Sequence, residues 1–294
     1  MIRLEDGNLQ AQIDPACGNS VRSLRLGGEE FVWTGAEKGH LDGIPLVAPW
    51  ANRIDGLEYF ANGRKYVLNP ALENLRIDAN GLPIHGLLLF TDAWKLVRQD
   101  ARSVTSRIEF WRRPEWMAQF PFAHAIEITH RIRDGALEIE TAVENFSDEP
   151  MPLCVGFHPY MRLPGSARDD WRVHIAAREQ VILSAKMVPT GERKSNPLPN
   201  PFPLRGAALD HVFSNLSGEA FVIENGRRRI EVRFGPKYPV AIVYSPPGGE
   251  FVCIEPMSAL TNAFNLEYAG IASGLQRVAP GETWREIFSI TPVT

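Results

Sequence analysis

The chain has 294 residues, 44% of them hydrophobic, and carries a formal net charge of -4 at pH 7. This composition is typical of a folded globular protein, and the lack of a basic surplus argues against nucleic acid as a partner. No apolar run approaches the ~18 residues of a membrane-spanning helix, and charged residues interrupt the first fifteen positions, so we expect neither a membrane partner nor a secretory signal.

Alternation of apolar and polar side chains predicts β-strands along the whole chain. In chain order, the predicted strands and hairpins cover residues 9–13, 21–26, 59–68, 94–97, 104–111, 126–132, 137–143, 172–175, 221–234, 240–244, 251–254 and 286–290. Three hairpin turns are expected at dipeptides that readily adopt positive φ, namely Asn62-Gly63, Asp134-Gly135 and Asn225-Gly226. The stretch 189–205 contains five prolines and is expected to be an ordered loop.

No segment carries a sustained 3.6-residue period with helix caps, so helices should be short and sparse. Many short strands separated by Gly, Pro, Asn and Asp indicate an all-β fold, either a sandwich or a barrel. Strand patterns resume on both sides of the proline-rich stretch without a shift in composition, and the chain has no internal repeat. We therefore predict a single domain over residues 1–294.

Four short segments place polar or ionisable residues among apolar ones. They contain, in chain order, the pair Asn52-Arg53, then His85, His158 and Glu255. Each has an ordinary structural explanation when taken alone, such as an ion pair, a hydrogen-bonded core histidine or a charge at a strand end. Strand ends that deliver ionisable residues into turns are also a common way to build a site on a rigid scaffold, so the set predicts a functional site.

These segments and their order resemble the aldose 1-epimerase, or galactose mutarotase, family. The resemblance is carried by Ala48-Pro49-Trp50-Ala51-Asn52-Arg53-Ile54, Phe60-Ala61-Asn62-Gly63, Tyr66-Val67-Leu68, His85-Gly86, Trp94, Gly156-Phe157-His158-Pro159-Tyr160, Cys253-Ile254-Glu255-Pro256-Met257 and Asn262-Ala263-Phe264-Asn265. It spans most of the chain and implies the large twisted antiparallel β-sandwich of that family. It also implies an isomerase that interconverts the α and β anomers of an aldose without metal or cofactor.

The resemblance also implies roles for individual residues. Glu255 stands where the family has its general base, and His158 where it has its general acid. Arg53 and His85 match substrate-contacting positions, and Asn52 is expected to bind the sugar beside Arg53. Asp210, in Leu209-Asp210-His211-Val212-Phe213, resembles the aspartate that binds sugar hydroxyls.

These residue types suit anomer exchange, which moves one proton off the C1 hydroxyl and places another on the ring oxygen. Histidine can donate and recover a proton near neutrality, and a partly buried carboxylate can accept one. We expect the acid and the base on opposite sides of the sugar. The family pattern is not followed at Leu87-Leu88-Leu89 and at Met161-Arg162-Leu163, so galactose is not assumed to be the substrate.

Other functions remain open on the same residues. A hexose-6-phosphate epimerase of the same fold would need Arg or Lys beside the pocket, for which Arg162 is a candidate by position. A carbohydrate-binding protein without turnover and a structural β-sandwich subunit are further alternatives. A glycosidase would need two facing carboxylates, which Glu255 and Asp210 could supply.

Metal and redox chemistry are not expected. His85, His158 and Glu255 contain no closely spaced ligand pair of the H-x-H kind, so we predict no metal site. The cysteines Cys17, Cys154 and Cys253 are odd in number and far apart, which favours a reducing compartment, and hence the cytoplasm, over a disulfide framework. We expect them to be buried as small apolar side chains.

Overall fold

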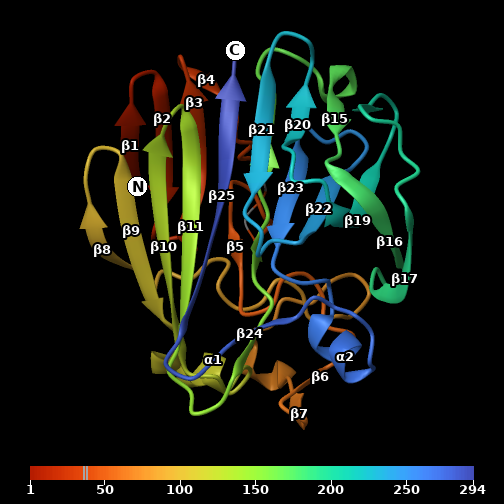
Figure 1. Cartoon of the computed structure of the whole chain (residues 1–294). Coiled ribbons are helices and arrows are strands. Elements are labelled where there is room, and N and C mark those ends of the chain that lie inside the picture. Colours follow the sequence, from red (N-terminus) through yellow and green to blue (C-terminus); the bar gives the residue numbers. More distant parts are fainter. Residues whose placement is uncertain (36, 38) are drawn as a thin grey trace.

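The structure is a computed structural model that describes residues 1–35, 37 and 39–294. It is built almost wholly of antiparallel strands (Figure 1). The largest sheet has nine strands, in the spatial order β18 (Phe202–Pro203), β15 (Arg172–His174), β20 (Phe221–Glu224), β21 (Arg229–Phe234), β25 (Thr283–Val293), β11 (Ala136–Asn145), β10 (His124–Arg133), β9 (Ser103–Glu109) and β8 (Lys95–Gln99).

A second sheet of eight strands carries most of the residues discussed below. Its spatial order is β17 (Pro189–Ser195), β16 (Ala177–Leu183), β19 (Leu209–Leu216), β22 (Val240–Ser245), β23 (Val252–Met257), β13 (Gly156–Phe157) and β5 (Leu46–Val47), and β14 (Tyr160–Met161) also pairs with β23. The strand β23 therefore has a neighbour along each side, which buries all six of its residues.

Smaller elements surround the two large sheets. A four-stranded sheet contains β1 (Ile2–Asp6), β2 (Leu9–Asp14), β3 (Ser20–Leu26) and β4 (Glu29–Glu30); two pairs are formed by β6 (Glu58–Ala61) with β7 (Arg64–Val67) and by β12 (Met151–Leu153) with β24 (Gln276–Val278). The described helices are α1 (Pro114–Met117), α2 (Ala263–Tyr268) and the 3-10 turns Pro70–Leu72, Phe110–Arg112 and Arg168–Asp170. No described helix has the length and apolar character needed to cross a membrane.

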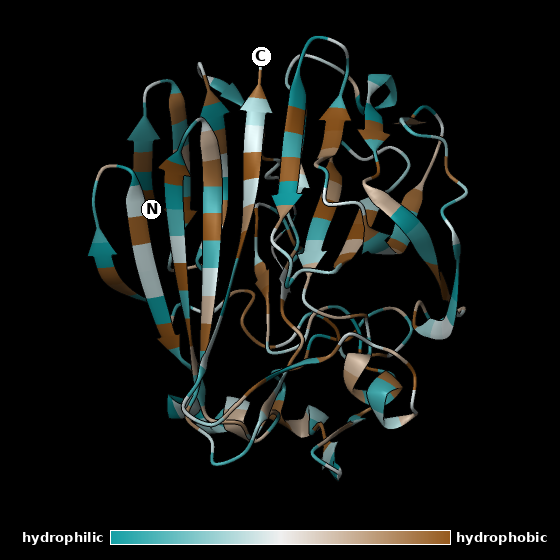
Figure 2. Cartoon of the chain, viewed as in Figure 1, coloured by the Kyte–Doolittle hydropathy of each residue, from teal (hydrophilic) through white to brown (hydrophobic). Residues whose placement is uncertain are grey.

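The core forms because the strands alternate between buried and solvent-facing residues, seen as bands of opposite hydropathy in Figure 2. On β11, Leu137 and Ile139 are buried while Glu138 and Glu140 face outward. The two large sheets meet at Phe157 of β13 and Phe288 of β25, whose rings lie 4.8 Å apart. Burial of such aromatic rings is worth about 1.5–3 kcal/mol each, so this layer contributes strongly to stability.

The predicted fold class, an all-β antiparallel sandwich, is confirmed, and helices are short as expected. Two of the predicted turns use positive φ at both central residues, with values of 51° and 72° at Asn62 and Gly63, and 50° and 78° at Asp134 and Gly135. At the third turn Gly226 alone has positive φ, at 82°, and the Asn225 side-chain oxygen accepts hydrogen bonds from the backbone amides of Arg227 and Arg228 instead.

Other parts of the strand prediction are wrong. The first part of the stretch 189–205 forms the strand β17 instead of a loop, and Pro189 occupies its first position at the sheet edge, where a missing N–H is tolerated. The strand predicted over 104–111 ends at Glu109, and a 3-10 turn follows. The strand β16 was not predicted because most of its residues are only partly buried, which removes the alternation. Cys154 and Cys253 are buried as expected, but Cys17 is only half-buried.

Candidate active site

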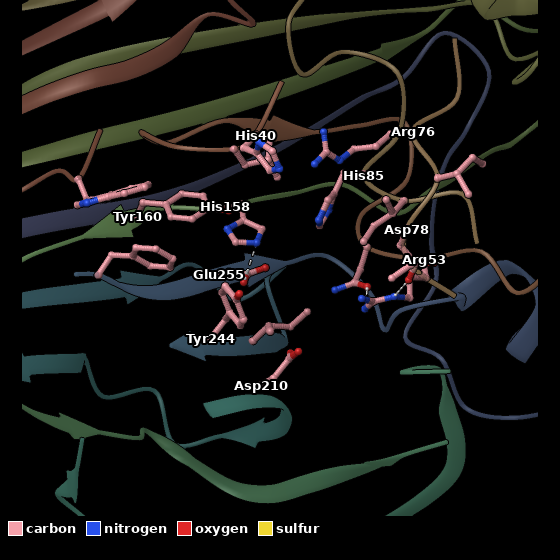
Figure 3. A pocket seen from close by; sticks show the side chains of 18 of the residues that line it. His40, Arg53, Arg76, Asp78, His85, His158, Tyr160, Asp210, Tyr244 and Glu255 are labelled. Carbon is pink, nitrogen blue, oxygen red and sulfur yellow. Dashed lines mark hydrogen bonds and ion pairs between the residues drawn. The ribbon is translucent and has the colours of Figure 1, made fainter. Parts of the chain in front are cut away.

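One pocket of about 740 Å³ gathers all six residues that the sequence singles out. Its lining includes Asn52, Arg53, His85, His158, Asp210 and Glu255. They come from segments far apart in the chain, and the sheet topology brings them together. Figure 3 shows the side chains of Arg53, His85, His158, Asp210 and Glu255 around one space.

Glu255 lies in the middle of β23 and is almost fully buried, with an exposed fraction of 1%. Neither carboxylate oxygen accepts an aligned hydrogen bond from a described residue. Burial and the negative charge of Asp210 raise the pKa of Glu255 well above its ordinary value, while the Arg53 cation opposes the shift. The charged form of a buried carboxylate is poorly stabilised when no hydrogen-bond donor contacts it. Glu255 is therefore suited to exchange a proton with a ligand.

His158 lies beside this carboxylate, with Nε2 3.3 Å from Oε1 of Glu255. The ring stacks on Tyr160 and meets the edge of His85. Burial lowers the pKa of His158 to about 3, and the cation of Arg76 adds to the effect. The expectation of an acid and a base on opposite sides of the sugar is therefore wrong for this arrangement, because the two groups lie side by side.

A glycine sets this spacing. Gly156 of β13 pairs with Met257 of β23, and a Cβ added at Gly156 would lie 2.2 Å from the Met257 sulfur and 2.6 Å from the Pro256 carbonyl oxygen. Only glycine permits so close an approach of the two strands. The approach positions His158, two residues further on, beside Glu255.

His85 lies on a tight loop that packs against the Asn52 segment. Its φ is 63°, its backbone N–H donates to the Asn52 carbonyl at 2.9 Å, and Gly86 lies so close to Ala48 that no Cβ would fit. Burial lowers the pKa of His85 well below its ordinary value, and the positive charges of His158, Arg53 and Arg76 lower it further. His85 is therefore a neutral hydrogen-bonding group at neutral pH.

Arg53 is fixed by two partners. Its Nε donates to Asp78 at 2.6 Å and its Nη1 donates to the Asn52 side-chain oxygen at 3.0 Å. Asp78 in turn accepts from the backbone amides of Asn80 and Leu82 at 2.8 and 2.9 Å. Asp78 was not recognised from the sequence, where its only local signal is that the segment Asp78-Ala79-Asn80-Gly81 favours a turn.

Asp210 projects from β19 at the mouth of the pocket, opposite Tyr244 in the sheet register. Its side chain is exposed, yet the surrounding protein desolvates it enough to raise its pKa, with Arg53 and His211 opposing the shift. An exposed, ionisable carboxylate at the rim can accept hydrogen bonds from hydroxyl groups.

One wall of the pocket is aromatic, which the sequence analysis did not predict. Trp33 and Tyr160 each lie 4.8 Å from Phe251 between ring centroids, and Tyr244 completes the wall at 6.0 Å from Phe251. Trp33, Tyr160 and the hairpin that carries Tyr244 and Phe251 are distant in sequence. The pairing of β14 and β22 with β23 brings Tyr160 beside this hairpin. An aromatic face can pack against the C–H face of a small polar ligand.

The described residues contain a group that could hold a metal ion at this place. Ligand atoms of His158, Cys253 and Glu255 all lie within 4.8 Å of one another. However, burial and the charge of Glu255 raise the pKa of the Cys253 thiol well above its ordinary value. A protonated thiol is a poor metal ligand, so the prediction of a metal-free site is kept.

Arg162, considered above as a phosphate ligand, does not line this pocket. It lies beyond the end of β14 and lines a separate cavity with Arg168, Trp171 and Glu250. Arg76, which does line the main pocket, was not singled out because its surrounding sequence has no periodic pattern.

The fold and the pocket together define a galactose mutarotase-like β-sandwich protein. The family model described as aldose 1-epimerase matches residues 1–291. The chain belongs to the aldose 1-epimerase family.

The chain is also similar to individual known proteins. The uncharacterized protein YihR of Escherichia coli is 25% identical over 228 residues, which cover 75% of this chain and 71% of that protein. A galactose mutarotase-like protein from Clostridium acetobutylicum has a similar structure, with a TM-score of 0.86, 21% identity and coverage of 99% and 94% of the two chains. A putative aldose 1-epimerase from Escherichia coli gives a TM-score of 0.80 at 20% identity, covering 99% and 98%. At these identities the solved structures establish the fold.

Proposed function

We propose that the protein is a mutarotase that interconverts the α and β anomers of an aldose, with Glu255 as the base and His158 as the acid. The observation that carries the proposal is the 3.3 Å separation of Glu255 Oε1 and His158 Nε2 at the bottom of a polar pocket. The C1 hydroxyl oxygen and the ring oxygen of an aldose are bonded to the same carbon. A base and an acid that lie side by side can therefore serve both oxygens.

Glu255 and His158 together account for both proton transfers of the reaction. Glu255 takes the C1 hydroxyl proton while the bond between C1 and the ring oxygen breaks, and His158 gives a proton to the ring oxygen. The aldehyde carbon rotates about the C1–C2 bond, and the ring closes on the other face as both protons return. Positioned acids and bases contribute about 10²–10⁴-fold to such reactions.

The protonation state of the pair fits this scheme. Burial raises the pKa of Glu255 and lowers that of His158, so a proton on the pair resides on Glu255 when no ligand is bound. A C1 hydroxyl that donates to Glu255 would stabilise its charged form, and the proton can then pass to His158 over 3.3 Å. Sugar binding would thus produce the base and the acid together.

The other residues of the pocket would position the sugar. Arg53, fixed by Asp78 and Asn52, and the neutral His85 can donate to hydroxyl oxygens, while Asp210 can accept from hydroxyl groups. The aromatic wall would pack against the less polar face of the ring. Such positioning holds C1 and the ring oxygen against their proton partners.

The test is anomer equilibration, followed by polarimetry from a pure anomer of each of several aldoses. We expect Glu255→Gln and His158→Asn each to lower kcat by about 10²-fold or more, with sugar binding retained within about tenfold. The double variant should be little worse than the worse single variant, because ring opening needs both transfers. Wild-type protein that binds a sugar but does not speed equilibration would instead favour a carbohydrate-binding protein without turnover.

A further inference from the structure

One cation of the pocket has no carboxylate partner among the residues that the structure describes. Arg53 is neutralised by Asp78. Arg76 lines the same pocket and is half-buried, but it forms no ion pair with a described residue, although the carboxylates of Glu37 and Asp210 also line the pocket. An anionic ligand in the pocket would supply this partly desolvated cation with a counter-ion.

Most hydrogen-bond donors of Arg76 are also unused by described residues. Its Nη1 donates to the Gly39 carbonyl oxygen at 2.7 Å, whereas a guanidinium carries five N–H donors in a planar fork. Figure 3 shows the guanidinium pointing into the pocket, toward His40 and His85. The remaining donors are therefore available to a ligand on that side.

The positive charge of Arg76 is not among the causes that shift the pKa of Glu255, the proposed base. The cation that lowers the pKa of Glu255 is Arg53, whereas Arg76 lowers the pKa values of His158 and His85. Arg76 thus disfavours the protonated form of the proposed acid, which works against the reaction while its charge is unbalanced. An anion bound at Arg76 would remove this opposition.

The position of Arg76 relative to the proposed chemistry indicates which part of the sugar it faces. His158 would contact the ring oxygen, which is bonded to C1 and to the carbon that bears the exocyclic group. That group therefore lies on the His158 side of the sugar. In Figure 3, Arg76 lies beyond His85 on one side of the proton pair, whereas Asp210 lies on the other.

From these observations we propose that the substrate is an aldose with an anionic group, a phosphate or a carboxylate, on its exocyclic carbon, and that Arg76 binds this group. The planar fork of a guanidinium matches both oxyanions in bidentate fashion. This inference rests on the mutarotase function proposed above. It adds that the charge of the substrate neutralises Arg76 and so assists protonation of His158, which a neutral sugar cannot do.

The experiment compares matched sugars on the whole protein. Several aldoses are each offered as the neutral sugar, the 6-phosphate and the 6-carboxylate, and anomer exchange is measured by NMR exchange spectroscopy with subtraction of the uncatalysed rate. The variants are wild type, Arg76→Gln and the matched control Arg162→Gln, which removes the same charge from the separate cavity. Comparison of the phosphate and carboxylate arms identifies the anion.

We expect wild type to have a kcat/KM at least about tenfold higher for one charged form than for its neutral parent. Arg76→Gln should lower kcat/KM for the charged form by about 10–100-fold, the range for a charge-assisted hydrogen bond. It should not lower kcat/KM for the neutral form, because with a neutral sugar the unbalanced Arg76 charge only opposes protonation of His158. Arg162→Gln should leave both unchanged.

Two results would overturn the inference. Wild type that prefers the neutral sugars, or an Arg76→Gln variant that loses activity equally on charged and neutral forms, would refute the role of Arg76 while leaving the mutarotase proposal intact. No exchange activity on any sugar would instead refute the mutarotase proposal, and the inference with it.

Discussion

Replacing Gly156 by alanine tests whether the close approach of β13 to β23 holds His158 beside Glu255. The added Cβ would lie 2.6 Å from the Pro256 carbonyl oxygen and 2.2 Å from the Met257 sulfur. The methionine side chain can rotate away, but the carbonyl belongs to the sheet backbone. Restoring an ordinary contact of 3.4 Å to that oxygen requires β13 to move by 0.8 Å, the difference between the two distances.

A shift of that size should lower the catalytic rate strongly and the free energy of unfolding only modestly. A misplacement of about 1 Å can lower an enzymatic rate by about 10²-fold, and overpacking of a core position costs about 1–3 kcal/mol. We therefore expect Gly156→Ala to remain folded, with a lower melting temperature, and to lose about 10²-fold in kcat measured by polarimetry well below that temperature.

Gly249→Ala is the matched control. Gly249 lies in the turn between β22 and β23, has no positive φ, and its added Cβ would meet no atom closer than 3.1 Å. It should keep nearly full activity. A Gly156→Ala protein with wild-type kcat would refute the reasoning, because the spacing of the proton pair would then not depend on how closely the strands approach.

Two further predictions concern the pocket. Asp78→Asn should lower kcat/KM, measured by steady-state kinetics, by about tenfold or more. The substitution removes the charged partner of Arg53 and weakens the hydrogen bonds that Asp78 accepts from Arg53 and from the Leu82 amide. Unchanged kinetics would mean that Asn52 alone positions Arg53. Because the pKa of His158 is lowered to about 3 and that of Glu255 is raised, a single proton on the pair resides on Glu255. A second proton is added only as the pH falls toward about 3, and the single proton is lost above the raised pKa of Glu255. A profile of kcat/KM against pH should therefore show no loss between pH values of about 7 and 5, and an acidic limb near the ordinary histidine value of about 6.5 would contradict it.

The sequence predicted the fold class because that class depends on local patterns. Alternation along β11 and the turns at Asn62-Gly63 and Asp134-Gly135 are visible in a few residues. The six proposed site residues were recognised by their segments and by the family resemblance, and all of them line one pocket. Their roles stay predictions.

What the sequence could not predict depends on contacts between distant segments. Asp78 and Arg76 lie on an irregular loop, and nothing in their spacing shows that one side chain pairs with Arg53 while the other has no such partner. Arg162 was considered because of its place in the chain, yet the end of β14 directs it to another cavity. The 3.3 Å separation of the proton pair likewise arises from strand pairing that no local pattern encodes.

The proton pair and the groups proposed to select the sugar belong to different kinds of structure. Glu255 lies on β23, which has neighbouring strands on both sides. His158 lies directly between β13 and β14, and both of these strands pair with β23. Arg53, Arg76 and His85 lie on connecting segments outside the named strands. Loops tolerate substitution far better than paired strands. Exchanges at Arg76 or its neighbours could therefore redirect the protein from one sugar to another within an unaltered reaction centre, which makes this pocket a suitable starting point for laboratory evolution of sugar specificity.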